Sequence, residues 1–267
     1  MSSSIIIVFT LTFFIYYLNT LSLSVRIVGI RTKKMAATYS VYNIIFLMAR
    51  FANTLQAPLL SKRVELSIIQ NEPIDYYLFY SLIFFSFLGG VAGAFSIPTM
   101  QRFMAKAVEK AHAKNAIYQL LTGIYKKSTL KHLRQSLKLP NVDNFRRLIR
   151  ISDLPIGIIS MNLIITALLT VSVLACLYAG YLNPELRTTC LSMNGFIVGL
   201  SVILSMLITE PHLSILGDKV AFQGMDEGYF RRYLGLVVVA RLVGSGLSFL
   251  LLVPMAKFVV FLAQHIF

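Results

Sequence analysis

The chain has 267 residues, of which 57% are hydrophobic and only 13% are charged. Soluble domains carry about twice that share of charged residues, so the composition excludes a soluble globular protein and predicts an integral membrane protein. A net charge of +14 would suggest nucleic acid in a soluble protein. In a membrane protein it is the ordinary excess of Lys and Arg in cytoplasmic loops, and no nucleic-acid partner is expected.

Six stretches reach the length of about twenty apolar residues that crosses a bilayer. In chain order they are roughly 5–25, 36–60, 76–99, 154–182, 190–209 and 233–264. The last is long enough to be tilted or broken near Pro254. The first is no cleavable signal, because nothing basic precedes it and its apolar run is too long. We therefore predict an all-α polytopic membrane protein, with residues 1–267 as a single transmembrane domain of six helices.

The basic residues of the connecting loops predict the orientation. The loops after the first, third and fifth stretches hold nineteen Lys and Arg residues, whereas the other two loops hold only Lys62, Arg63 and Arg187. Since cytoplasmic loops are the basic ones, both termini are expected outside.

The long loop 101–153 lies between the third and fourth stretches and carries twelve basic and three acidic residues. Its first part, QRFMAKAVEKAHAKNAIYQLLTGIYKK, interleaves apolar residues with lysines at helical spacing. This pattern predicts a basic amphipathic helix, interrupted at Gly123 and Pro140, that suits the headgroups of an anionic leaflet and makes membrane lipids a partner. A solvated cytoplasmic hairpin accounts for the same charges equally well.

Arg50 stands in the middle of the second stretch, NIIFLMARFANTLQAPLL. A guanidinium stays charged in proteins, so its cost at membrane depth cannot be avoided by losing a proton. The residues that share its helical face are polar or small: Asn43, Asn53, Thr54 and Ala57. We therefore expect Arg50 to face the bundle interior, a water-filled cavity or a partner.

Arg241 has a similar setting in the sixth stretch, where its face holds Gly244, Ser245 and Ser248. The segments FLMARFANTLQAPLL and VVVARLVGSGLSFLL align when Arg50 is set on Arg241, and Leu-Ser recurs in the first and fifth stretches. These matches predict a parallel repeat of helices one and two in helices five and six, although apolar helices also match by chance.

The apolar stretches contain no acidic residue to pair with either arginine; the nearest are Glu210 and Asp218, expected at the cytoplasmic end of the fifth. An external anion is therefore one expected partner, and backbone carbonyls at a helix break are the alternative. At the inner mouth of the first stretch, Asn19, Arg26 and Arg31 extend the polar path, and a guanidinium there suits a phosphate. Glu210 and Asp218 are the candidates for coupling or gating.

Other site chemistry is not indicated. The four histidines lack ligand spacing, so no metal site or cofactor is expected, and no nucleotide-binding or hydrolase motif is present. Cys176 and Cys190 flank one external hairpin, where they either pair or serve as packing residues. Three pairs of small residues permit close helix crossings within the molecule or, as the alternative, in a homodimer: Gly89/Gly93, Gly195/Gly199 and Gly244/Ser248.

The runs TLSLSVRIVGIRTKKMA and NIIFLMARFANTLQAPLL, with EPHLSILGDKVAFQG after the fifth stretch, resemble the Amj family of lipid II flippases, the alternate to MurJ. The resemblance covers the chain end to end. It implies a bacterial cytoplasmic-membrane protein that moves the undecaprenyl-diphosphate-linked disaccharide-pentapeptide from the inner to the outer leaflet, without covalent chemistry.

Combined with the residues, the resemblance gives a specific expectation for the path of the diphosphate. It enters near Arg26 and Arg31 and meets Arg50 and Arg241, while the headgroup contacts Asn19, Asn43 and Asn53. Two rivals remain. One is a membrane-embedded enzyme or accessory protein that acts on polyprenyl phosphates at the cytoplasmic surface through Glu210, Asp218 and Asp226. The other is a small-anion exporter.

Overall fold

The computed structural model of the chain describes residues 3–113 and 154–266, and every regular element within these ranges is a helix. The elements are α1 (Ser3–Thr32), α2 (Met35–Ile69), α3 (Tyr76–Ala113), α7 (Ile156–Leu182), α8 (Arg187–Leu204), the π-helical turn η1 (Ser205–Thr209), α9 (Glu210–Phe222) and α10 (Glu227–His265). Because α8, η1 and α9 run on as one helix, six helices are long and apolar enough to span a membrane. The predicted all-α fold with six membrane helices is confirmed.

The helices continue beyond the apolar stretches that predicted them. The first runs to Thr32, so Arg26 lies inside a helix rather than at its mouth. The fifth runs to Phe222 and includes Glu210 and Asp218. The expectation that no acidic residue lies within a span is therefore wrong. The helices extend past the apolar stretches because partners on other helices bind the polar side chains at their ends.

A π-helical turn interrupts the fifth helix directly before Glu210. The backbone N–H of Glu210 bonds to the carbonyl of Ser205, five residues back. The next residue, Pro211, has no N–H to donate, so the widened turn forms where the α-helical ladder is already weakened. Such turns recur at functional sites, and the residue that follows this one, Glu210, lines a cavity between the helices.

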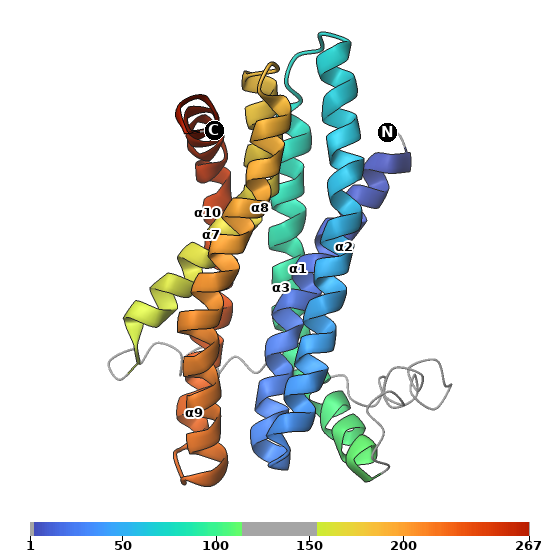
Figure 1. Cartoon of the computed structure of the whole chain (residues 1–267). Coiled ribbons are helices and arrows are strands. Elements are labelled where there is room, and N and C mark those ends of the chain that lie inside the picture. Colours follow the sequence, from blue (N-terminus) through green and yellow to red (C-terminus); the bar gives the residue numbers. More distant parts are fainter. Residues whose placement is uncertain (1–2, 114–153, 267) are drawn as a thin grey trace.

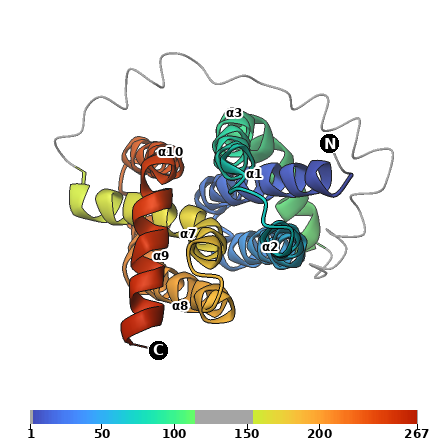
Figure 2. The same ribbon diagram turned by 90° about the horizontal axis from the view of Figure 1, so that it is seen from above.

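The six helices form two groups of three, seen end-on in Figure 2. In the N-terminal unit (α1–α3), α1 packs against both α2 and α3. In the C-terminal unit (α7–α10), α7 packs against both α8 and α10. The main contact between the two units is that of α3 with α10. Figure 1 shows both chain termini at one end of the bundle, which we call the terminal end. The α1–α2 turn and α9 lie at the opposite end, which we call the basic end.

Small residues bring the helices of each unit into close contact. A Cβ added to Gly89 would collide with the carbonyl oxygen of Phe13 on α1. On α10, a Cβ at Gly244 would lie 2.5 Å from the carbonyl oxygen of Leu163 on α7. By contrast, Gly195 and Gly199 on α8 have nothing within 4 Å of an added Cβ. Two of the three small-residue pairs therefore serve packing within the molecule, and the homodimer stays a prediction.

Three other expectations meet the structure differently. Cys176 and Cys190 are free thiols buried in the main hydrophobic core, so they are packing residues. The predicted parallel repeat, which set Arg50 on Arg241, is not confirmed. The helix of Arg241, α10, packs on α7 through small residues as α3 packs on α1. By packing, α10 therefore corresponds to α3, whereas Arg50 lies on α2. Residues 101–113 are the last turns of α3; the rest of the predicted amphipathic segment, 114–153, lies outside the described residues.

The packing predicts opposite effects of one substitution at two glycines. Gly89→Ala should destabilise the protein by about 1–3 kcal/mol, because the added methyl group overpacks the α1–α3 contact. Gly195→Ala should be neutral or stabilising by up to about 1 kcal/mol, because Ala favours a helix and the site is open. Since both thiols are buried, a thiol-reactive fluorophore reports unfolding of the detergent-solubilised protein on heating. Equal melting temperatures for the two variants would contradict the assigned contact.

Candidate functional site

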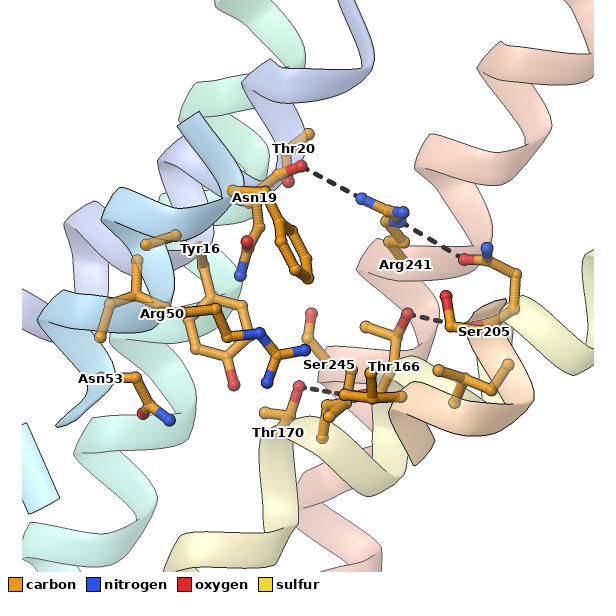
Figure 3. Close-up of a pocket in the computed structure, with 18 of the residues that line it drawn as sticks. Tyr16, Asn19, Thr20, Arg50, Asn53, Thr166, Thr170, Ser205, Arg241 and Ser245 are labelled. Atoms are coloured by element: carbon orange, nitrogen blue, oxygen red, sulfur yellow. Dashed lines mark hydrogen bonds between the residues drawn. The ribbon is translucent and has the colours of Figure 1, made fainter. Parts of the chain in front are cut away.

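A cavity lined by both polar and apolar side chains lies between the two units in the middle of the bundle. It encloses about 120 Å³, and its walls come from both halves of the chain, as Figure 3 shows. We call it the central cavity. Its polar lining residues are Tyr16, Asn19 and Thr20 of α1; Tyr42, Asn43, Arg50 and Asn53 of α2; Asn162, Thr166 and Thr170 of α7; Ser205 and Glu210; and Arg241 and Ser245 of α10.

Arg50 projects its guanidinium into the central cavity (Figure 3). The guanidinium carbon lies 4.9 Å from the ring centroid of Phe46, one turn earlier on the same helix. Within residues 3–113 and 154–266, no carboxylate forms an ion pair with it. A cation over a ring face is stabilised by about 0.5–2 kcal/mol, which is less than the cost of a charge at membrane depth. The site therefore favours an anion beside Arg50.

Arg241 enters the same cavity from the opposite unit but is already held in place. Its Nε donates to the side-chain oxygen of Asn162 at 3.4 Å, and one terminal nitrogen donates to the backbone carbonyl of Asn19 at 3.1 Å. These contacts join α10 to α7 and to α1. Neutral acceptors hold the guanidinium without neutralising its charge, so Arg241 adds a second positive charge to the cavity.

Arg26 does not face an open mouth. It is buried, and it forms an ion pair with Glu210, whose other carboxylate oxygen accepts a hydrogen bond from the Tyr42 hydroxyl at 2.9 Å. The Arg26 guanidinium also lies 4.6 Å from the Tyr42 ring centroid. The expected role of Arg26 as a free phosphate contact is therefore not met in this conformation, because a carboxylate on α9 occupies the guanidinium.

The remaining expected site residues divide between the cavity and the basic end. Asn19, Asn43 and Asn53 line the central cavity, and the buried side-chain oxygen of Asn19 has no hydrogen-bond partner. Arg31 lies outside it, in an exposed ion pair with Glu227 at 2.9 Å. Asp218 is exposed and borders a separate pocket of about 280 Å³ at the basic end, which Arg26 also lines.

The wall supplied by α7 was not predicted from the sequence. Asn162, Thr166 and Thr170 recur at four-residue intervals, so they lie on one helical face, and all three line the cavity. This spacing is visible in the sequence, but hydroxyl side chains bonded to their own helix also occur in ordinary packing. Of the residues expected to share a face with Arg241, Ser245 lines the cavity, whereas Gly244 and Ser248 pack against α7.

A seam between α2 and α8 borders the central cavity on the side away from α3 and α10. In the described part of the chain these two helices do not pack closely along their length. Their outer faces carry exposed large apolar residues, including Leu47 and Phe51 on α2 and Leu200 and Ile203 on α8. At the terminal end the seam is bridged by an ion pair of 3.1 Å between Arg187 and Glu65. At the seam, the polar side chains of the central cavity therefore lie close to the apolar outer surface of α2 and α8.

Comparisons with known proteins identify the family of the chain. Residues 11–263 match the family model described as Amj: Alternate to MurJ. The chain belongs to the Amj family. It is also 25% identical over 264 residues, covering 98% of each chain, to the protein of Bacillus subtilis (strain 168) named lipid II flippase Amj. No solved structure matches the chain.

The buried ion pair yields a prediction about stability. Glu210→Gln should cost about 3–5 kcal/mol, because it leaves the buried guanidinium of Arg26 without a counter-charge. The double variant Arg26→Met with Glu210→Gln should recover much of this loss. Arg231→Gln, which removes an exposed pair within α10, should cost less than about 1 kcal/mol. The measurement is the thermal unfolding of each variant in detergent. A double variant less stable than both Arg26→Met and Glu210→Gln alone would contradict the assigned ion pair.

Proposed function

We propose that this chain is a lipid II flippase that moves the undecaprenyl-diphosphate-linked precursor from the inner to the outer leaflet. The observation that carries the proposal is Arg50, a permanent cation in a polar cavity at the middle of the bundle with no carboxylate partner in the described residues. The name of the Bacillus subtilis relative supports the substrate class. In this proposal the basic end faces the cytoplasm, because Lys and Arg are concentrated in the loops at that end.

A lipid-linked diphosphate supplies the charge that the cavity lacks. It brings about two negative charges, and Arg50 and Arg241 bring two positive charges from opposite walls. Charge-assisted hydrogen bonds between guanidinium and phosphate are among the strongest in proteins, and they strengthen where water is excluded. Asn53 and Tyr16 also line the cavity and are placed to donate further hydrogen bonds. The cavity therefore favours the diphosphate over a neutral sugar or a hydrocarbon.

The seam between α2 and α8 suits the rest of the lipid. The prenyl tail can remain in the bilayer against the exposed apolar faces while the diphosphate occupies the polar interior. At about 120 Å³, the cavity is smaller than the roughly 300–1,000 Å³ of pockets for drug-sized ligands. It fits a diphosphate but not a disaccharide-pentapeptide, so passage of the whole headgroup requires the two units to move apart.

Three pockets follow one another along α1 and suggest the route. The basic-end pocket includes Arg26, the central cavity includes Asn19 and Tyr16, and a small polar pocket toward the terminal end includes Tyr16 and Thr12. The Arg26–Glu210 pair separates the first pocket from the second. A diphosphate entering from the cytoplasm would compete with Glu210 for Arg26, and this competition gives both residues a role in admission.

The rival enzyme would need its carboxylates free and close together. Glu210 is engaged by Arg26 and Tyr42, and Asp226 is the N-cap of α10, where it accepts hydrogen bonds from the backbone N–H groups of Gly228 and Tyr229. Asp218 is exposed and does not line the central cavity. These placements favour transport over chemistry at the cytoplasmic surface.

Arg50 is the residue on which activity should depend most. Arg50→Ala should abolish growth of a bacterial strain that lacks its other lipid II flippase and relies on this chain. Arg50→Lys should lose at least tenfold in transport, because an ammonium cannot make the two-pronged contact. Lys257→Ala is the matched control, since Lys257 is also a cation within a membrane helix but is exposed. Full growth with Arg50→Ala, at normal protein level, would refute the proposal.

Purified protein in vesicles separates the candidate functions. Labelled lipid II is placed in the inner leaflet, and its appearance in the outer leaflet is followed with an impermeant reagent. Unmodified lipid II outside supports the flippase. A chemically altered lipid supports the enzyme, and efflux of a small anion without lipid movement supports the exporter.

A further inference from the structure

The N-terminal and C-terminal units match helix by helix. In each, the first helix packs against the second and, most closely, against the third. The membrane helices have 28, 35 and 30 residues in one unit and 27, 36 and 39 in the other. The contacts between the units also form matched pairs: α1 with α9 corresponds to α7 with α2, and α1 with α10 corresponds to α7 with α3. The α3–α10 contact corresponds to itself.

The matched helices run in opposite directions across the bundle. In Figure 1, α1 runs from the terminal end to the basic end, whereas α7 runs from the basic side toward the terminal end. The same reversal relates α2 to α8–α9 and α3 to α10. An arrangement of this kind is the result of a two-fold axis that lies in the plane of the membrane and passes between the units.

The sequences of α1 and α7 share a short motif in the same register. Thr20-Leu21-Ser22-Leu23 corresponds to Thr170-Val171-Ser172-Val173. At that register, Phe13 corresponds to Leu163 and Tyr17 to Ala167. These are the residues whose carbonyl oxygens meet the small residues of the third helices: Phe13 and Tyr17 lie against Gly89 and Gly93, and Leu163 and Ala167 against Gly244 and Ser248. Prolines also lie inside both third helices, Pro98 in α3 and Pro254 in α10.

Every ion pair between different helices in the described ranges joins one unit to the other. Arg26–Glu210 and Arg31–Glu227 connect α1 to the C-terminal unit at the basic end. Arg187–Glu65 connects α8 to α2 at the terminal end. The fourth pair, Arg231–Glu227, lies within α10. The central cavity thus lies between ion pairs at its two ends, and among residues 3–113 and 154–266 neither unit contains an ion pair between its own helices.

We propose that α1–α3 and α7–α10 form an inverted repeat around the central cavity, and that Glu227 and Glu65 are gating residues at its opposite ends. In an inverted repeat, exchanging the tilts of α1 and α7 exchanges the conformations of the two ends. Breaking the tie at one end therefore opens that end and closes the other. The inference rests on the proposed function only in assigning this alternation to lipid transport.

The test is the accessibility of the cavity from each side of the membrane. Thr166→Cys places a reporter on the cavity wall, and Cys176→Ala with Cys190→Ala removes the native thiols. An impermeant thiol reagent is applied to intact spheroplasts and to inside-out vesicles containing the full chain. Glu65→Gln should raise labelling from the terminal end about two- to fivefold and lower it from the basic end, as expected for losing an exposed ion pair. Glu227→Gln should do the reverse.

Matched controls separate gating from general loosening. Glu185→Gln removes an exposed carboxylate near the terminal end that forms no ion pair in the described residues, and Arg231→Gln leaves the Arg31–Glu227 tie in place; both should label like the parent. Exchanging the charges of one tie, with Glu65→Arg and Arg187→Glu together, should restore the parent ratio. Labelling that rises from both sides, or does not change, would overturn the inverted gate.

The outcome is distinguishable from that of the proposed function. The labelling needs no lipid II, so reciprocal labelling without lipid II transport would leave the inverted gate standing and remove the proposed substrate. Lipid II transport with non-reciprocal labelling would do the opposite.

Discussion

A permanent positive charge with no counter-charge among the described residues is the constraint on which the rest of the structure depends. Arg50 cannot be neutralised by losing its proton, and the described residues offer it only the ring of Phe46. The fold surrounds it with polar side chains from five of the membrane helices and keeps apolar side chains on the outer faces of α2 and α8. This arrangement favours an anion beside Arg50, which the proposed lipid diphosphate would supply.

Arg26 and Arg241 show how differently the same side chain can be used. Arg26 is neutralised by Glu210 and supported by Tyr42, so it holds two units together. Arg241 is fixed by an amide and a backbone carbonyl, so it is oriented but remains positively charged. Only the arginines left without a carboxylate add net charge to the cavity. Under the proposed function, this difference gives binding to Arg50 and Arg241 and closure to Arg26.

The sequence predicted the features that depend on one helix at a time. Hydropathy located six membrane helices, and helical spacing brought Asn43 and Asn53 to the face of Arg50. Contacts between distant helices were beyond such reasoning. The Arg26–Glu210 pair was missed because a hydropathy window ends a helix where its polar end begins, although the helix continues. The small residues beside Arg241 were read as part of its polar face, whereas Gly244 and Ser248 serve close packing. The proposed inverted relation of the units was hidden because, apart from the short motif shared by α1 and α7, it preserves packing positions more than residue identity.

The central claim is that a lipid diphosphate is the counter-charge of Arg50, and direct binding tests it. The chain has no tryptophan, so Phe46→Trp places a single fluorophore against the Arg50 guanidinium and keeps a ring beneath it. Titration of this variant in detergent with a polyprenyl diphosphate should give a saturable change in tryptophan emission. The change should be at least tenfold weaker with the uncharged polyprenol and absent when Arg50→Gln is added. An unaltered binding curve with Arg50→Gln would contradict the account.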